Sequence, residues 1–161
     1  MSLFEKYSNL EGRVYLLEKE KRFQDGFNLL QEQLENKIQS FVSQDDPDAE
    51  LRIVEINTCL LGVIQFCQRV SGRLEEEERD SLWTTLLDTL GKHLENMSNP
   101  EPWREMIRHV ISSMLGHVGH KKVVSLVLSN PTSSSGKWSD LKQMLMELTE
   151  TFRCAFFINL N

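Results

Sequence analysis

A serine-rich loop ending in Gly136 and Lys137 is the first place where residue types and spacing could do chemistry. It follows the apolar run at 123–128 and precedes an expected helix, which is where a phosphate-binding loop would stand. Such a loop needs a glycine five residues before Gly136, and Pro131 occupies that place. It also needs a serine or threonine after the lysine to hold magnesium, and Trp138 follows instead. We therefore interpret the segment as a plain loop before a helix, with no nucleotide and no other cofactor.

Four histidines raise the question of a metal site: His93, His109, His117 and His120. His117 and His120 are three residues apart, but Gly119 is expected to end the helix between them. Zinc sites need three or four converging ligands, and Glu105 is the one acid near His109, His117 and His120, with His93 further off. The pattern favours surface or half-buried histidines at a turn, and we predict no metal.

Three cysteines are present: Cys59, Cys67 and Cys154. An odd number without tight spacing is typical of a reducing compartment. Cys59 and Cys67 are eight residues apart on one expected helix, so about 12 Å separates them along its axis. That distance excludes a disulfide. No histidine with an orienting acid stands nearby to activate a nucleophile, so both are predicted to be small buried apolar side chains.

The remaining candidates are a run of acids at 75–78 and three tryptophans, Trp83, Trp103 and Trp138. General acid–base chemistry needs paired carboxylates in a shielded pocket. Adjacent glutamates instead favour the exposed first turn of a helix, where the helix dipole stabilises negative charge. Tryptophans can anchor interfaces, but core or half-buried positions are the more common use. We predict no enzyme activity and assign no catalytic, cofactor or metal residue; interaction residues stay unassigned.

Composition limits the class of protein further. The 161 residues are 40% hydrophobic and 26% charged, with 4 prolines and 8 glycines. So few breakers favour long helices in one soluble domain, or in one piece of a larger domain. The net charge of −6 argues against an extended basic surface for nucleic acid or anionic lipid. No run of 18 apolar residues predicts a membrane span, and the early charges do not suit a signal peptide.

The elements that must position these residues are helices throughout. We predict an all-α alpha-solenoid of stacked helical hairpins, with about six or seven helices. Turns near residues 20, 73 and 118 are spaced like the repeats of helical-hairpin solenoids. Residues 1–9 are a lead-in whose first three residues carry no structural weight, 10–157 form a single solenoid segment, and 158–161 are a tail. The expected helices span 10–19, 22–42, 49–71, a stretch beginning near 75, 100–117, 123–128 (helix preferred over strand) and a last stretch from 137, with an apolar face of Leu141, Met144, Leu145, Leu148 and Phe152.

The first expected hairpin, residues 12–34, shows why neighbours are needed. Its second helix carries one apolar face made by Phe23, Phe27, Leu30 and Leu34. Gly26 lies inside that face and costs about 1 kcal/mol relative to alanine, so we expect it to permit close approach of a partner helix.

The helix at 49–71 is the predicted cover for this face. Its middle, residues 58–67, is apolar on most sides and is predicted to be buried at the centre of the packing. Asp46 is expected to cap it, with Pro47 in its first helical position.

Three stretches resemble the helical C-terminal half of the vacuolar protein sorting-associated protein 8 family. They are GRVYLLEKEKRFQDGFNLLQEQLENKIQ (12–39), LLGVIQFCQRVSGRLEEEERDSLWTTLLDTL (60–90) and VISSMLGHVGHKKVVSLVLSNPTSSSGKWSDLKQMLMELTETF (110–152). The second stretch carries the family's ordered pattern at Cys67, Gln68, Arg69, Glu78, Arg79, Leu82, Trp83, Leu86 and Leu87. The resemblance covers nearly all of residues 10–152, and the chain departs from it after Phe152.

The resemblance implies a non-enzymatic scaffold segment of CORVET, an endosomal vesicle-tethering complex that serves protein transport to the vacuole or lysosome. It implies other tethering subunits, the class C core, as partners, with no nucleic acid and no small-molecule substrate. It also implies a cytoplasmic location, peripheral on early endosomes, with indirect membrane association. The family's propeller and RING-type residues have no counterpart here, so Rab binding and RING chemistry are not carried over. The alternatives are an unrelated helical-repeat adaptor, or a small helical enzyme or ligand carrier with a cavity near Cys67 and His109.

Overall fold

The computed structural model describes residues 3–42, 47–94 and 101–129, together with Gln143, Met146, Glu147 and Glu150. Over these residues it holds six helices and no strand, which confirms the predicted all-α class. The helices are α1 (Leu3–Lys19), α2 (Phe23–Val42), α3 (Ala49–Ser71), α4 (Glu76–Leu94), α5 (Glu101–Met114) and α6 (His120–Ser129).

Most predicted helix boundaries hold within a few residues. The largest difference is α1, which begins at Leu3 rather than near residue 10. The ambiguous run at 123–128 lies inside α6, so the preference for helix over strand is confirmed. α5 ends at Met114, before the expected residue 117. The serine-rich loop, Cys154, Trp138 and most of the helix expected from 137 lie outside the described residues.

The start of α3 corrects the predicted cap. Asp48 is the N-cap residue, and its side chain makes no capping hydrogen bond. The backbone N–H of Arg52 donates to the carbonyl of Asp48 at 3.1 Å, which is the bond that opens the helix. The prediction that Pro47 takes the first helical position was therefore wrong, because Pro47 and Asp48 form a turn before Ala49.

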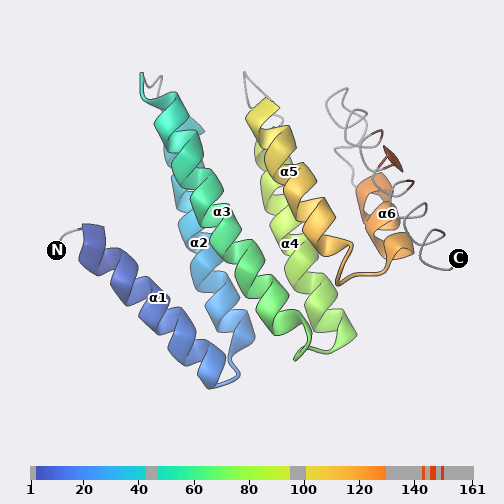
Figure 1. Ribbon diagram of the computed structural model, residues 1–161, viewed down its shortest axis with the longest axis horizontal. Coiled ribbons are helices and arrows are strands. Elements are labelled where there is room, and N and C mark those ends of the chain that lie inside the picture. The colour runs from blue at the N-terminus through green and yellow to red at the C-terminus, as the bar shows by residue number, and fades with distance from the viewer. Residues whose placement is uncertain are drawn as a thin grey trace, which may run out of the picture. The chain divides into compact units, whose positions relative to one another are not determined.

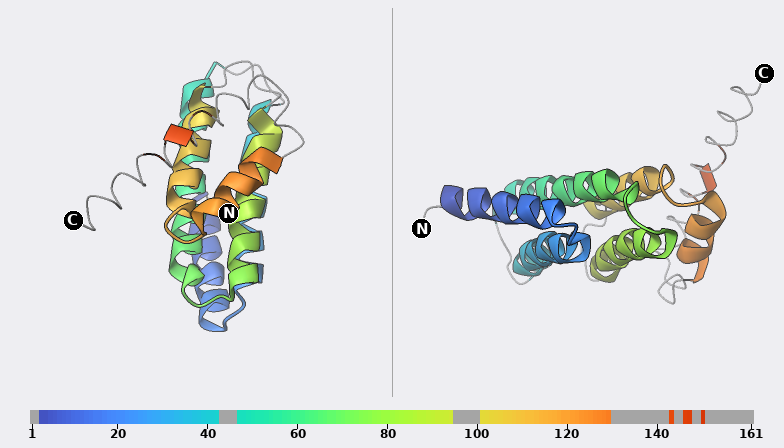
Figure 2. Two further views of the ribbon diagram at one scale, coloured as in Figure 1. Left: turned by 90° about the vertical axis from the view of Figure 1, so that its right-hand side faces the viewer. Right: turned by 90° about the horizontal axis from the view of Figure 1, so that it is seen from below.

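The chain divides into two compact units, Met1–Trp83 and Thr84–Asn161, which are described separately. The prediction of one continuous solenoid segment over 10–157 stays a prediction. In the first unit α2 packs against both α1 and α3 (Figure 1). Seen from below, α1 and α3 lie in one layer and α2 in the other (Figure 2).

The contact between α2 and α3 confirms the role predicted for Gly26. A Cβ atom at Gly26 would stand 3.1 Å from Cζ of Phe66, a residue of α3. Phe27 and Leu34 of the α2 face are fully buried and Phe23 is 8% exposed, whereas Leu30 is only half-buried. The helix at 49–71 is thus the partner of this face, as the sequence predicted.

The turn that closes the first hairpin uses a left-handed residue. Lys21 has φ of 61°, and the N–H of Arg22 donates to the carbonyl of Leu17 at 2.8 Å. The N–H of Lys21 donates to the carbonyl of Glu18 at 3.1 Å. This pairing satisfies the last carbonyls of α1 and is usually built around glycine.

Buried hydrogen bonds join the end of α3 to α4 within the first unit. The indole N–H of Trp83 donates to the hydroxyl of Ser71 at 3.1 Å, and that hydroxyl donates to the carbonyl of Cys67. Trp83 is fully buried and Ser71 is 2% exposed, so the hydroxyl supplies the acceptor that a buried indole donor needs.

The second unit is also built from amphipathic helices. Hydrogen bonds from the N–H groups of His117 and Val118 to the carbonyl of Met114 form the expected tight turn between α5 and α6. The predicted apolar face of α4, which begins in the first unit, is buried along its length. The buried residues of α4 and α5 include Leu82, Trp83, Leu86, Leu87, Leu90, Trp103, Met106, Ile107, Val110, Ile111 and Met114.

Candidate interaction surface

The histidines do not converge on a metal site within the described residues. His109 and His120 are exposed, and His93 and His117 are half-buried. No group of three or more histidine, cysteine or acidic side chains in the described ranges could hold a metal ion. This placement matches the predicted surface or half-buried histidines near a turn.

The two described cysteines differ in burial. Cys67 is fully buried, and burial raises the pKa of its thiol to about 12, so the nucleophilic thiolate is disfavoured. Cys59 is half-buried. Burial also raises the pKa of the Cys59 thiol, and the positive charge of Lys37 partly opposes this. Both are free thiols, so the prediction of a buried apolar side chain is confirmed for Cys67 and only partly for Cys59.

The acids at 75–78 are all exposed, as predicted for the first turn of a helix. Trp83 and Trp103 are 0% and 1% exposed, so both fill the interior rather than present an anchor at the surface. The sequence-level candidates therefore do not assemble into a catalytic arrangement in the described part of the chain.

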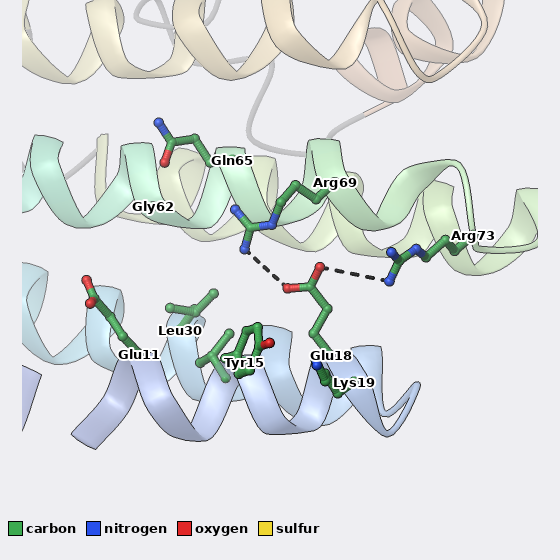
Figure 3. A pocket seen from close by; sticks show the side chains of 10 residues that line it. Glu11, Tyr15, Glu18, Lys19, Leu30, Gly62, Gln65, Arg69 and Arg73 are labelled. Atoms are coloured by element: carbon green, nitrogen blue, oxygen red, sulfur yellow. Dashed lines mark hydrogen bonds and ion pairs between the residues drawn. The ribbon is translucent and has the colours of Figure 1, made fainter. Parts of the chain in front are cut away.

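A groove in the first unit lies between α1 and α3. Its volume is about 560 Å³, and Leu30 of α2 contributes to its lining. Val14 and Tyr15 line it from α1, and Gly62 and Gln65 line it from α3 (Figure 3). Tyr15 is 56% exposed, so an aromatic ring stands at the surface of this α1–α3 groove.

One end of the α1–α3 groove is charged. The carboxylate of Glu18 lies 3.4 Å from a guanidinium nitrogen of Arg69 and 4.0 Å from one of Arg73, so it forms ion pairs with both arginines (Figure 3). Only 16% of the Glu18 side chain is exposed. The ammonium of Lys19 lies 5.1 Å from the centre of the Tyr15 ring, and hydrogen bonding with Tyr15 raises the pKa of Lys19.

The exposed face of α3 also carries a row of four side chains, which we call the α3 stripe: the apolar Leu51, Val54 and Leu61, with the polar Thr58 between Val54 and Leu61. Leu51 and Val54 are each 60% exposed and Leu61 is 41% exposed. Residues three and four apart on a helix share a face, and here the steps are three, four and three. Large apolar side chains in such a row on a surface typically mark a binding site.

Leu61, at 41% exposed, corrects in part the prediction that residues 58–67 are buried at the centre of the packing. The other face of α3 is buried, through Ile56, Leu60, Val63, Ile64, Phe66, Cys67 and Val70. α3 also has the length and the mean hydropathy of 1.2 found in membrane spans, a test that core helices of soluble proteins pass as well. The steps of three and four in the sequence would have revealed the stripe, had the helix been divided into two faces.

The architecture defines the class of protein. The described residues form packed helical hairpins with buried seams, an open groove and an exposed apolar stripe. The class is an all-α protein of helical hairpins.

The comparisons with known proteins agree with the family resemblance drawn from the sequence. The chain is 26% identical over 160 residues to the vacuolar protein sorting-associated protein 8 homolog of Mus musculus, which covers 94% of this chain. It is 24% identical over 149 residues to the homolog of Homo sapiens, which covers 88% of this chain. The resemblance to this family is thereby confirmed.

The similarity concerns a small part of these relatives. The chain spans about a tenth of their length, 11% of the mouse protein and 10% of the human protein. No family model matches the chain. No solved structure shows a significant match.

Proposed function

We propose that this chain is a non-enzymatic scaffold segment of a vesicle-tethering subunit that acts in vacuolar protein sorting. The observation that carries the proposal is the similarity to vacuolar protein sorting-associated protein 8 homologs over about nine tenths of the chain. The names of those relatives describe vacuolar protein sorting. Helical hairpins that present a groove and an exposed apolar stripe support the scaffold role.

The physical features of the first unit support a scaffold. Its core is apolar and is closely packed at Gly26 and Phe66. The exposed side chains of the α3 stripe and Tyr15 supply apolar area for a protein partner. Helical hairpins of this kind bind partners through broad faces assembled from several helices.

The finer proposal is membership of the CORVET complex. In that setting the partners are the class C core subunits, and the chain is peripheral on the cytoplasmic face of early endosomes. Its membrane association is indirect, through those subunits. The chain acts on no nucleic acid and on no small-molecule substrate.

The test is retention of the class C core by the chain. The tagged 161-residue chain is immobilised and exposed to the purified core, with a tagged helical-repeat protein of similar charge as the control. We expect stoichiometric retention on this chain alone. Equal retention on both proteins, or on neither, counts against the assignment to this complex and favours an unrelated helical-repeat adaptor.

A second measurement addresses the alternative of a small ligand carrier or enzyme. A ligand that binds the folded chain raises its melting temperature by mass action. We expect no shift with a panel of divalent metals and nucleotides. A concentration-dependent rise with one compound would contradict the scaffold proposal.

A further inference from the structure

We propose that the α3 stripe and the charged end of the α1–α3 groove form one docking site for an amphipathic α-helix of a partner protein. The partner helix would place apolar side chains on Leu51, Val54 and Leu61 and an acidic side chain on Arg69 and Arg73. This inference rests on the proposed scaffold function and names the kind of segment that the scaffold holds.

The geometry of α3 fits a helix as the occupant. At 3.6 residues per turn, positions 51, 54, 58, 61, 62, 65 and 69 fall within an arc of roughly 100°. An apolar face about 100° wide is what amphipathic helices present to one another. From residue 51 to residue 69 α3 rises about 27 Å, so a partner helix of about 18 residues matches the site in length.

The surface of this arc is apolar in its first part and becomes a groove in its second part. Leu51, Val54 and Leu61 make its first part apolar, and Gly62 leaves open space, since a Cβ atom there would meet nothing within 4 Å. The second part is the α1–α3 groove, whose volume of about 560 Å³ can receive several side chains of a partner. Tyr15 stands at its surface from α1.

The positive charges of Arg69 and Arg73 favour a partner helix with an acidic side chain at one end. The side chains of Arg69 and Arg73 are 53% and 61% exposed, and they share the single carboxylate of Glu18. Each guanidinium carries five N–H donors, more than one carboxylate can accept from two arginines. Lys19 adds a third positive charge beside them, and Glu11 is the other acid in the lining. A second carboxylate, brought by the partner, completes this cluster.

The acidic flanks of the stripe disfavour a membrane surface as the occupant. Glu50 and Glu55 are exposed on its two sides, with the ammonium of Lys37 4.0 Å from the Glu55 carboxylate, and the chain as a whole carries a charge of −6. Anionic headgroups would be repelled along the apolar part of the site. A helix with neutral or basic residues beside its apolar face meets the same acids favourably.

The test uses the 161-residue chain and labelled model helices of about 18 residues. Each peptide carries leucines at alternating steps of three and four and two glutamates in either its first or its last turn. A matched pair replaces the glutamates by glutamine. We expect saturable binding by fluorescence anisotropy, with one glutamate peptide binding about tenfold more tightly than its glutamine partner at low salt. Absence of saturable binding by either glutamate peptide overturns the proposal.

Variants of the chain locate the site. Val54→Lys and Leu61→Lys change exposed side chains, so the fold should survive, and each should weaken binding about tenfold or more. Asn57→Lys, on the same helix but outside the arc, should leave binding within about twofold. The double variant Arg69→Glu with Arg73→Glu should reject the glutamate peptide and accept a lysine version. Equal weakening by Asn57→Lys refutes the site, and so does a failure of the Arg69→Glu with Arg73→Glu variant to bind the lysine peptide.

The other occupants give distinct results. One such result is that the chain binds no peptide but sediments with vesicles of neutral and anionic phospholipid, and loses this sedimentation in Val54→Lys. That result would overturn the proposal and assign the site to a membrane surface. A concentration-dependent dimer that is lost in the same variant would assign the site to a second copy of the chain. Retention of the class C core without peptide binding refutes this inference alone, whereas peptide binding without core retention refutes the proposed complex alone.

Discussion

The close contact between Gly26 and Phe66 gives a prediction in which two known effects oppose each other. Replacing a glycine inside a helix by alanine stabilises the helix by about 0.5 to 1 kcal/mol. At Gly26 the new methyl group would stand 3.1 Å from Cζ and 3.3 Å from Cε2 of Phe66, whose side chain is fully buried. Overpacking of a buried contact costs about 1 to 3 kcal/mol. Gly26→Ala should therefore be neutral or destabilising.

Gly62 supplies the matched control, because it lies inside α3 and a Cβ atom there meets nothing within 4 Å. Gly62→Ala should stabilise the chain by about 0.5 to 1 kcal/mol, with no opposing clash. The two alanine variants should differ by about 1 to 3 kcal/mol in the free energy of unfolding. Urea titration followed by circular dichroism gives the global value, and hydrogen exchange in α2 and α3 gives the local one.

A double-mutant cycle identifies the cause. In a Phe66→Leu background the ring is gone, so Gly26→Ala should recover the stabilisation that helix propensity predicts. If Gly26→Ala stabilises the original chain as much as Gly62→Ala does, the close approach does not limit this position and the reasoning is refuted. If the loss persists without the Phe66 ring, another neighbour is responsible.

Three further predictions concern stability. Lys21→Gly should raise the free energy of unfolding by about 1 kcal/mol, because Lys21 has φ of 61° and side chains are strained there; an unchanged melting temperature would contradict this. Ser71→Ala should lower the free energy of unfolding by about 1 to 3 kcal/mol, because it removes the hydroxyl that accepts from the buried indole N–H of Trp83. Thr58→Ala, which removes an exposed hydroxyl, is the control, and equal losses in the two variants would refute the role of burial. Burial raises the pKa of Cys67 from 9.0 to about 12, so the folded state binds the proton more tightly, and its stability should fall as pH rises from 9 toward 12. That fall should be shallower in Cys67→Ala, and an identical pH profile would contradict the assignment.

The parts of the fold that follow from short-range patterns could be predicted from the sequence. The spacing of Phe23, Phe27 and Leu34 placed the buried face of α2, and the glycine inside it indicated the close approach that Phe66 makes. These features depend on periodicity and side-chain size, which a sequence displays directly.

Features that depend on which neighbour is present could not be predicted in the same way. The apolar run at residues 58–67 indicates burial, yet α1 and α2 cover α3 incompletely and Leu61 within the run stays exposed. Leu51 and Val54, earlier on the same helix, are exposed as well. The N-cap of α3 is Asp48 rather than Asp46, and the Asp48 side chain makes no capping hydrogen bond, so the preference of carboxylates for N-cap positions did not locate this boundary. The pairing of Glu18 with two arginines joins side chains about 50 residues apart, and no local signal reports it.

The α3 stripe also affects the expected abundance of this chain in a cell. Chaperones and proteases continuously survey accessible apolar segments of newly made and unassembled subunits. With Leu51, Val54 and Leu61 uncovered, the chain presents such a segment even when it is fully folded. Its lifetime should then follow the supply of the protein that covers the stripe, so that depletion of that protein removes this chain too, without any change in its own synthesis.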